Sequence, residues 1–368
     1  MKEKKIKVGI LFGGKSAEHE VSLQSAKNVA DAIDKGKYDI VLIGIDKNGK
    51  WHLNTDTSKF LLNSHNPKLI ALNKENAKSV ALIPQSNSFL SLENSVINTS
   101  NTEKIDVIFP ILHGPFGEDG TVQGLLKLAG VPFVGAGVLG SAVGMDKDVM
   151  KRLLRDAQIP IGKFLTAHEG EKLSFKTVAK TLGLPFFVKP ANMGSSVGVS
   201  KVSKQSQFTI AVKEAFAFDQ KILLEENISG REIECSVLGN ENPIASLPGE
   251  IIVHNEFYSY EAKYIDEHGA SLAIPAKLSK AEIKKVQKLA IATFKTLSCE
   301  GLGRVDFFLK KNGEFIVNEI NTIPGFTSVS MYPKLWEASG IPYTKLIDIL
   351  IQLALERFEK EKRLKTTK

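Results

Sequence analysis

The chain has 368 residues, of which 43% are hydrophobic and 24% are charged, so it can bury more than one core and we expect two or three domains. Much of its net charge of +7 lies in the lysine-rich ends, at 2–7 and 360–368, which argues against a nucleic-acid surface. Two distant cysteines and the lack of an apolar run of about 20 residues argue against a disulfide framework and a membrane span, and they predict a soluble, cytoplasmic protein with no membrane partner.

The start of the chain has the pattern of a βαβ unit. Residues 6–12 are a short apolar run typical of a buried strand, residues 21–33 have a helical pattern, and a second strand is predicted at 38–46. This unit predicts a parallel sheet with both faces covered. Residues 47–103 are rich in Asn, Ser and Lys, and we expect a solvated insertion there, most clearly at 85–101.

Regular structure is predicted again after residue 104. The expected elements are a strand at 105–112, a helix near 147–157, strands at 164–166 and 186–189, a strand at 223–226, a helix at 280–297, a hairpin at 304–320 and a terminal helix at 343–360. This order predicts three consecutive α/β units.

Two glycine-rich motifs match nucleotide-binding patterns but stand in the wrong context. Residues 9–16, GILFGGKS, fit the P-loop pattern, yet their apolar residues belong to the predicted strand, whereas a P-loop needs these positions free to surround phosphate. Residues 135–140, GAGVLG, fit the dinucleotide pattern, but Asp156, the acid at the expected distance, lies in a predicted helix. We therefore reject both motifs as nucleotide sites.

A hairpin pattern carries the strongest functional signal. Asn312–Gly313 lies between two alternating segments, which favours a two-residue type I′ turn. Counting outward from this turn places Asp306 opposite Glu319 and Arg304 opposite Asn321. A three-residue turn would shift this pairing.

The predicted pairing indicates a metal site. Opposed carboxylates repel unless a cation lies between them, and Asn321 adds a neutral oxygen to Asp306 and Glu319. An all-oxygen set suits magnesium completed by water and phosphate. The alternative is a solvated face whose acids pair with Arg304 and nearby lysines. We favour the metal site because Val305, Phe307 and Val317 are predicted to bury the other face of the hairpin.

A second group of residues indicates a nucleotide site. Lys189 ends a predicted strand and precedes a loop of glycine and serine, which together can hold phosphate oxygens. Glu225 and Glu226 end another strand and can accept hydrogen bonds from ribose hydroxyls, while the adjacent backbone can contact adenine. A flexible turn and a charged turn are the alternative interpretations.

In this order, these motifs resemble the ATP-grasp superfamily and, within it, the D-alanine–D-alanine ligases. The matching segments are GGKSAEHEVSL (13–23), LHGPFGEDGTVQG (112–124), MDK (145–147), VKPANMGSSVGVSKV (188–202), YEAKY (260–264), GRVDFF (303–308) and NEINTIPGFTSVSMYP (318–333). The resemblance implies an α/β fold, α+β in the ATP-grasp part, in which an N-terminal parallel-sheet domain precedes a two-domain ATP-grasp fold. The implied domains are an N-terminal domain at 1–135, a central ATP-grasp subdomain at 136–225 and a C-terminal domain at 226–368 with the metal hairpin and a lid at about 255–271.

The resemblance also implies the site residues. The catalytic residues would be Glu18, Ser195, Tyr264, Arg304 and Gly325, with the first three forming a hydrogen-bonded link and the last two stabilising an oxyanion. The ATP-binding residues would be Lys147, Lys189, Ser195, Glu225, Glu226, Ile228, Glu232 and Lys263. The substrate-binding residues would be Glu18, His113, Lys263, Arg304, Gly325, Ser330 and Met331. The ligands of two Mg²⁺ ions, with Mn²⁺ as a substitute, would be Asp306, Glu319 and Asn321.

The family's reaction joins two D-alanine molecules through an acyl-phosphate formed from ATP, for peptidoglycan precursor synthesis, and a homodimer is expected. The D configuration of the substrate rests on the resemblance alone. Three alternatives remain open: a vancomycin-resistance-type ligase that uses D-lactate or D-serine, another ATP-grasp carboxylate–amine ligase, and an ATP-binding regulatory protein with a dead site. The segment YEAKY with its Tyr264 favours D-alanine over the first alternative.

Overall fold

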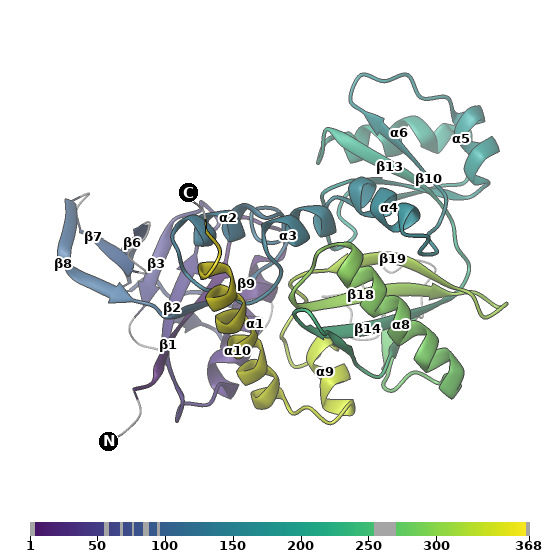
Figure 1. The fold of residues 1–368 in the computed structure, drawn as a ribbon. Helices are drawn as coiled ribbons and strands as arrows, with labels where there is room; N and C mark the ends of the chain where they lie inside the picture. Colours follow the sequence, from purple (N-terminus) through teal and green to yellow (C-terminus); the bar gives the residue numbers. More distant parts are fainter. Residues whose placement is uncertain are drawn as a thin grey trace.

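The computed structural model describes residues 4–54, 59–66, 69–75, 77–83, 88–93, 96–253 and 270–365. Three main sheets follow one another along the chain, and the helices pack against them (Figure 1). The elements around the first sheet are β1 (Ile6–Gly13), α1 (His19–Ala32), β2 (Tyr38–Ile45), β3 (Trp51–Asn54), β4 (Leu61–Leu62), β5 (Ala71–Leu72), β6 (Lys78–Ile83), β7 (Ser88–Glu93), β8 (Val96–Lys104), β9 (Val107–Leu112) and α2 (Thr121–Leu128).

The first sheet is mixed and has the strand order β8-β7-β6-β3-β2-β1-β9. Only its β2-β1-β9 part is parallel, and the remaining neighbours pair antiparallel. The expectation of a parallel sheet is therefore correct for the βαβ part and wrong for the rest. The expectation that 47–103 is a solvated insertion is also wrong, because this segment supplies four of the seven strands.

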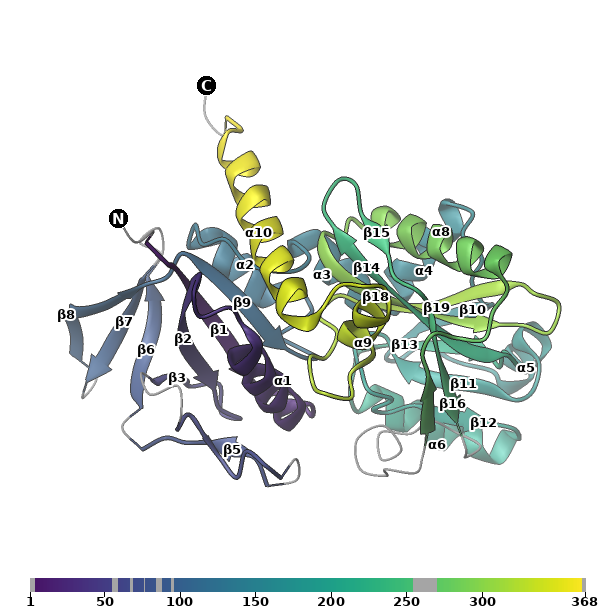
Figure 2. The same cartoon turned by 90° about the horizontal axis from the view of Figure 1, so that it is seen from below.

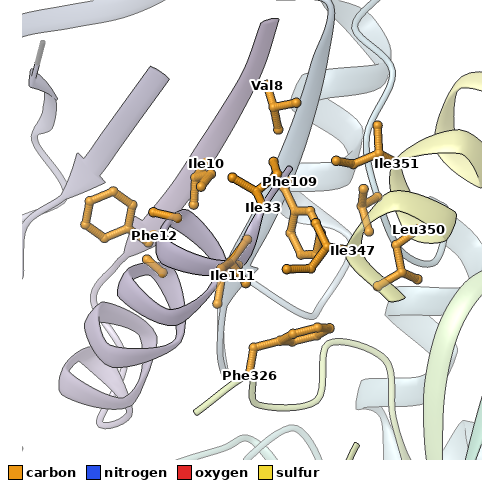
Figure 3. Close-up of a cluster of buried hydrophobic side chains, with 14 of the residues drawn as sticks. Val8, Ile10, Phe12, Ile33, Phe109, Ile111, Phe326, Ile347, Leu350 and Ile351 are labelled. Atoms are coloured by element: carbon orange, nitrogen blue, oxygen red, sulfur yellow. The ribbon is translucent and has the colours of Figure 1, made fainter. Parts of the chain in front are cut away.

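The β2-β1-β9 part of the first sheet is buried on both faces. Val8, Ile10 and Phe12 of β1 lie in one core together with residues of α1 and α10 (Tyr343–Lys362), as Figure 3 shows. Leu11 points to the opposite core, which contains Leu126 of α2. In both overall views α10 runs beside α1 and β9 (Figures 1 and 2). The helix from the end of the chain thus completes the core of the sheet from its beginning.

The second sheet has four strands in the order β10-β13-β11-β12. Its core lies against α5 and α6. The elements of this part are α3 (Val138–Met145), α4 (Lys147–Asp156), β10 (Phe164–His168), α5 (Phe175–Leu182), β11 (Phe186–Pro190), β12 (Ser200–Val202), α6 (Gln205–Phe216) and β13 (Lys221–Glu226). Helix α4 begins at Lys147 because the Asp146 carboxylate accepts hydrogen bonds from the backbone N–H groups of Asp148 and Val149.

The third sheet has the order β17-β16-β14-β18-β19, with β15 paired to β14. Its core is closed by α8 and by apolar residues of α4. The elements are β14 (Arg231–Gly239), β15 (Ile244–Ala245), β16 (Gly249–Val253), β17 (Ala270–Ala273), α8 (Lys280–Thr296), β18 (Gly301–Leu309), β19 (Phe315–Asn321) and α9 (Met331–Ala338). Helix α8 starts with a capping box between Ser279 and Glu282. The predicted helices at 147–157, 280–297 and 343–360 are confirmed within a few residues.

Candidate active site

The β18–β19 hairpin pairs the predicted residues, but its turn is longer than predicted and one strand contains a bulge. Asp306 lies opposite Glu319 and Arg304 opposite Asn321, as expected. The predicted two-residue turn is wrong: Lys310 and Glu314 close a three-residue turn, in which Gly313 has φ +78°. A β-bulge then leaves Asn318 unpaired and restores the register. Two departures of one residue each therefore cancel.

The bulge also explains which face of the hairpin is charged. Phe307 lies opposite Val317, and both are buried beside Val305. Because the bulge adds one residue, Asn318 and Glu319 both leave the core and line a cavity. The expectation that the other face of the hairpin is core is confirmed.

The charges on this face neutralise one another in part. The Arg304 guanidinium donates two hydrogen bonds of 2.8 Å to the Asp306 carboxylate, and its Nε lies 2.8 Å from Glu234 Oε2. Burial by itself lowers the pKa of Arg304, but Asp306 and Glu234 raise it well above its ordinary value. Asn321 Nδ2 donates to Asp306 at 2.9 Å. Sequence analysis missed Glu234, which pairs with Asp306 across β14 and β18.

The donor set of the hairpin fits a hard divalent cation. Asp306, Glu319 and Asn321 offer only oxygen ligands, as magnesium prefers. Within the described ranges, no group of three or more His, Cys, Asp or Glu side chains is arranged to hold a metal ion. The hairpin set has only two carboxylates and one amide, so it does not form such a group. A metal ion bound there would take its remaining ligands from a bound substrate.

A cavity of about 390 Å³ lies between the second and third sheets. Its floor includes Asn318 and Glu319 of β19, and its opposite wall is formed by β11, β13 and the glycine-rich loop. The predicted ATP-binding residues that line it are Lys147, Lys189, Ser195, Glu225, Glu226, Ile228 and Glu232. The structure therefore brings together in one cavity seven predicted residues that lie between positions 147 and 232 and residues of the β18–β19 hairpin.

Buried charges line the deep part of this cavity. Glu225 forms ion pairs with Lys189 and with Lys151, whose Nζ lies 2.9 Å from Glu225 Oε1. Burial would raise the pKa of Glu225, but the two lysines lower it to about 2. Lys147 Nζ lies 3.6 Å from Glu319 Oε2 and donates to the Met193 carbonyl at 2.7 Å. Burial lowers the pKa values of Lys147 and Lys151.

Lys151 is a residue that sequence analysis missed. It lies one helical turn beyond Lys147 on α4 and is only 2% exposed. The i, i+4 spacing from a predicted phosphate lysine was the available signal, since such residues share one helix face.

The glycine-rich loop reaches across to the first sheet. Ser195 Oγ donates a hydrogen bond of 2.5 Å to Glu18 Oε1 at the start of α1. The contact that the resemblance implies between these two residues is thus present. Ser195 has φ +50°, in the left-handed region, which is uncommon for a non-glycine residue and typical of functional loops.

His113 lies close to the same place. Its Nδ1 is 3.1 Å from the Ile323 carbonyl, so Nδ1 carries a proton, and its buried Nε2 has no hydrogen-bond partner among the described residues. Burial by itself lowers the pKa of His113, but Glu118 and Glu18 outweigh it and raise this pKa above its ordinary value. The unpartnered Nε2 leaves one polar atom ready for a ligand.

The loop after β19 contains the remaining predicted residues. The backbone N–H of Gly325 donates to no acceptor among the described residues. Ser330 precedes α9, and Met331 is its first residue, so the Met331 N–H belongs to the helix terminus that lacks internal acceptors. The Ser330 hydroxyl accepts a hydrogen bond from the Thr327 N–H at 2.9 Å.

Several predicted residues lie outside the described part of the chain. These are Lys263 and Tyr264, together with the lid at 255–271 apart from its last two residues.

The structure agrees with the rejection of both glycine-rich motifs. Ile10–Phe12 are buried strand residues within β1, and Lys15 is exposed, so GILFGGKS does not form a phosphate loop. Asp156 is the last residue of α4 rather than the end of a strand. Among the helices that the structure describes, none has the length and apolar content to cross a bilayer.

Comparison with known proteins identifies the family. Residues 7–136 match the model for the D-Ala–D-Ala ligase N-terminus, and residues 153–352 match the model for its C-terminus. The D-alanine–D-alanine ligase of Oceanobacillus iheyensis is 56% identical over 370 residues, covering 99% of each chain. The D-alanine–D-alanine ligase structure from Coxiella burnetii superposes with a TM-score of 0.86 at 40% identity, covering 98% of this chain and 96% of that one. VanG D-Ala:D-Ser ligase from Enterococcus faecalis has a TM-score of 0.84 at 37% identity, covering 95% of this chain and 100% of that one. The chain therefore belongs to the D-alanine–D-alanine ligase family.

Proposed function

We propose that this chain joins two D-alanine molecules into D-alanyl-D-alanine, with conversion of ATP to ADP and phosphate, as a step in peptidoglycan precursor synthesis. The observation that carries the proposal is the cavity in which buried Lys147 faces Glu319 of the hairpin and buried Lys189 pairs with Glu225. The names of the relatives supply the substrate.

The lysines and the hairpin serve phosphoryl transfer in this proposal. A carboxylate is a poor electrophile, so the first D-alanine accepts the γ-phosphoryl group of ATP and becomes an acyl-phosphate. Lys147 and Lys189 place positive charge beside the phosphates. Asp306, Glu319 and Asn321 would hold Mg²⁺, as two ions with Mn²⁺ as a substitute, and the metal would neutralise charge on the transferring group. Glu225, Glu226, Ile228 and Glu232 would bind the adenosine.

The second step attaches the amine of the second D-alanine to the acyl carbon, and phosphate leaves. Negative charge develops on the acyl oxygen during this attack. Arg304 and the Gly325 N–H would stabilise that oxyanion. Arg304 is suited to this role because its carboxylate neighbours keep it protonated.

The two substrates would be held at opposite ends of the reacting centre. Glu18 and His113 would contact the ammonium group of the first D-alanine. Ser330 and the Met331 N–H would hold the carboxylate of the second, with Lys263 as its charge partner. Ser195 and Tyr264 would complete the link to Glu18.

The proposal also covers the oligomeric state of the protein, its location in the cell and its domain boundaries. We infer a homodimer in the cytoplasm, and three domains divided near 135/136 and 225/226. Light scattering coupled to size-exclusion chromatography tests the assembly, since a monomer at micromolar concentration would contradict it.

Phosphate release from ATP and Mg²⁺ by the purified protein tests the function. The arms contain D-alanine, L-alanine, D-alanine with D-lactate, D-alanine with D-serine, or no amino acid, and products are identified by mass spectrometry. We expect phosphate and D-alanyl-D-alanine in equal amounts with D-alanine alone. D-alanyl-D-serine formed in preference to the dipeptide would replace the proposal with the activity named for VanG, and a product with D-lactate would contradict it as well. ATP binding without turnover in any arm would favour a regulatory protein.

A further inference from the structure

The backbone of Phe326, next to Gly325, is fastened to two helices that pack on the first sheet. Its N–H donates to Ser25 Oγ of α1 at 3.1 Å. Its carbonyl accepts two hydrogen bonds, from Asn28 Nδ2 of α1 at 3.2 Å and from the Tyr343 hydroxyl of α10 at 2.7 Å. Side chains from both ends of the chain therefore hold the two backbone polar groups of Phe326: Ser25 and Asn28 lie 301 and 298 positions earlier, and Tyr343 lies 17 positions later.

The side chain of Phe326 anchors the same point. Its ring is fully buried in the first core, beside α10 (Figure 3). Its centroid lies 5.7 Å from that of Phe109 on β9, 5.6 Å from Tyr332 and 6.1 Å from Tyr343. Three aromatic neighbours in edge-on or tilted geometry fix the ring in place.

The other side of Gly325 is fastened as well. The carbonyl of Ile323 is bound by His113 Nδ1, which follows β9. The short stretch from Ile323 to Phe326 is thus held at both ends by the first sheet and its helices, although it continues directly from the third sheet. Gly325 lies between these fixed points, and its N–H is left without an acceptor in the described part of the chain.

Helix α1 joins this anchor to the Glu18 contact. Glu18 precedes its first turn, and Ser25 lies seven residues further along. At about 1.5 Å per residue, the helix separates the two residues by about 10 Å along its axis. One rigid element therefore sets the spacing between the group beside the first substrate and the oxyanion donor.

We propose that Ser25, Asn28 and Tyr343 are positioning residues that aim the Gly325 N–H at the oxyanion of the second step. This inference rests on the proposed function. None of the three side chains is placed on the substrates, and each acts through the backbone of Phe326. Correct placement matters because a donor displaced by about 1 Å can lose up to about 100-fold in rate.

Two tyrosines offer a matched pair of variants. Tyr343→Phe removes the hydroxyl that holds Phe326, whereas Tyr332→Phe removes a hydroxyl that donates to the Val237 carbonyl at 3.1 Å. Both rings pack on Phe326, and both hydroxyls are lost without change of ring. We expect similar decreases in Tm, of about 2–4 °C, for the two variants.

The catalytic rates of the two tyrosine variants are expected to differ. Tyr343→Phe should lower the kcat for D-alanyl-D-alanine about tenfold, with the KM for ATP unchanged, and Tyr332→Phe should stay within about twofold of wild type. Exchange of the bridging oxygen of the ATP γ-phosphoryl group reports reversible acyl-phosphate formation. Because only the second step is slowed, the ratio of this exchange to dipeptide formation should rise in Tyr343→Phe.

Asn28→Ala supplies a second variant on a half-buried side chain, with the same expected direction. Equal kcat in the two tyrosine variants, or a loss in Tyr343→Phe with an unchanged exchange ratio, would overturn the positioning role and leave the proposed function intact. Absence of dipeptide from the wild-type protein would instead overturn the proposed function itself.

Discussion

Opposite charges pack closely in the cavity, and each side chain there depends on a partner from another element. Glu225 on β13 lies between Lys189 on β11 and Lys151 on α4, and Lys147 faces Glu319 on β19. Removal of one member leaves a buried charge without compensation, which is costly in protein interiors. Substitution of one of these charged residues should therefore affect both activity and stability, and the size of each effect should depend on which charge is left without its partner.

Glu319→Gln should abolish metal-dependent turnover, with a loss of at least about 100-fold, while the fold is retained. The substitution keeps the size of the side chain but removes half of the opposed carboxylate pair that would hold the proposed cation. Glu314→Gln on the same hairpin is the control, since Glu314 is half-exposed and its carboxylate pairs with Lys310 at 3.1 Å. Steady-state phosphate release at varied Mg²⁺ measures both, and near-normal activity of Glu319→Gln would contradict the metal site.

Lys189→Ala should reduce kcat/KM for ATP about 100-fold or more, whereas Lys15→Ala should stay within about twofold. Lys189 is buried in the cavity, and Lys15 is exposed in the rejected P-loop motif. Kinetics at varied ATP compare the two variants. The reverse order of damage would show that the phosphates bind at residues 9–16.

Glu225 should make the stability of the ligand-free protein pH-dependent in the acid range. Its folded pKa of about 2 lies below the ordinary value of 4.5, so its ion pairs stabilise the native state above about pH 4.5 and this contribution is lost as the pH falls toward 2. The shift corresponds to about 3 kcal/mol. Urea unfolding of wild type and Glu225→Gln at pH 7, 4.5 and 3 measures it, and the free energy difference between them should shrink with acid. A constant difference would disprove the ion-pair origin.

At the level of elements, the hairpin shows what its sequence does and does not reveal. A two-residue turn would have placed Asn318 opposite Phe307 on the buried face, and this conflict was visible in the sequence. The apolar residues Phe315, Val317 and Ile320 change from odd to even positions, which is the pattern that a bulge produces. The pairing of Asp306 with Glu319 was predicted correctly, but only because the extra turn residue and the bulge offset each other.

Gly313→Ala should destabilise the protein by about 1 kcal/mol without changing kcat. Gly313 has φ +78°, which strains any residue with a Cβ, although no atom lies within 4 Å of the added methyl group. The turn is also remote from the ligand pairs. Chemical denaturation and steady-state kinetics test the two halves of this expectation, and a large loss of activity would show that the turn controls the metal register.

Segment 47–103 is the part of the fold that sequence analysis predicted wrongly. Its polar composition suggested an insertion, but β3, β6, β7 and β8 extend the first sheet. Composition reports the average exposure of a segment, while strand pairing depends on backbone hydrogen bonds that many polar residues also make. On the site side, family motifs supplied the residues of the cavity. Lys151 could have been found from its i, i+4 spacing to Lys147, whereas Glu234 became visible only through strand pairing.

At the scale of the whole molecule, the core of the first sheet is completed by α10, which comes after the other two sheets in the chain. Leu346, Ile347, Leu350 and Ile351 of α10 lie in the same core as Val8 and Ile10 of β1. Polar contacts reinforce this packing, because the Asp348 carboxylate accepts a hydrogen bond from the Tyr38 hydroxyl at 2.7 Å. A domain assigned to residues 1–135 would thus depend on residues beyond 340.

Leu350→Ala should therefore destabilise the first sheet, by about 2–5 kcal/mol, although Leu350 is far from it in sequence. Hydrogen exchange monitored by mass spectrometry should show the loss of protection in β1, β2 and β9 along with α10. Ile210→Ala on α6 is the control, because Ile210 is 69% exposed. Loss of protection confined to α10 would show that the sheet is stable without the helix.

The return of α10 to the first sheet has a consequence for synthesis on the ribosome. While residues 1–340 emerge, the apolar face of β1 and β9 that α10 covers has no permanent partner. The nascent chain must keep this face from aggregating until α10 has left the exit tunnel, so chaperones that bind exposed apolar surface have their longest opportunity on this part of the chain. Emergence of residues 343–362, rather than completion of the first sheet, then sets the moment at which the N-terminal part of the chain becomes fully native.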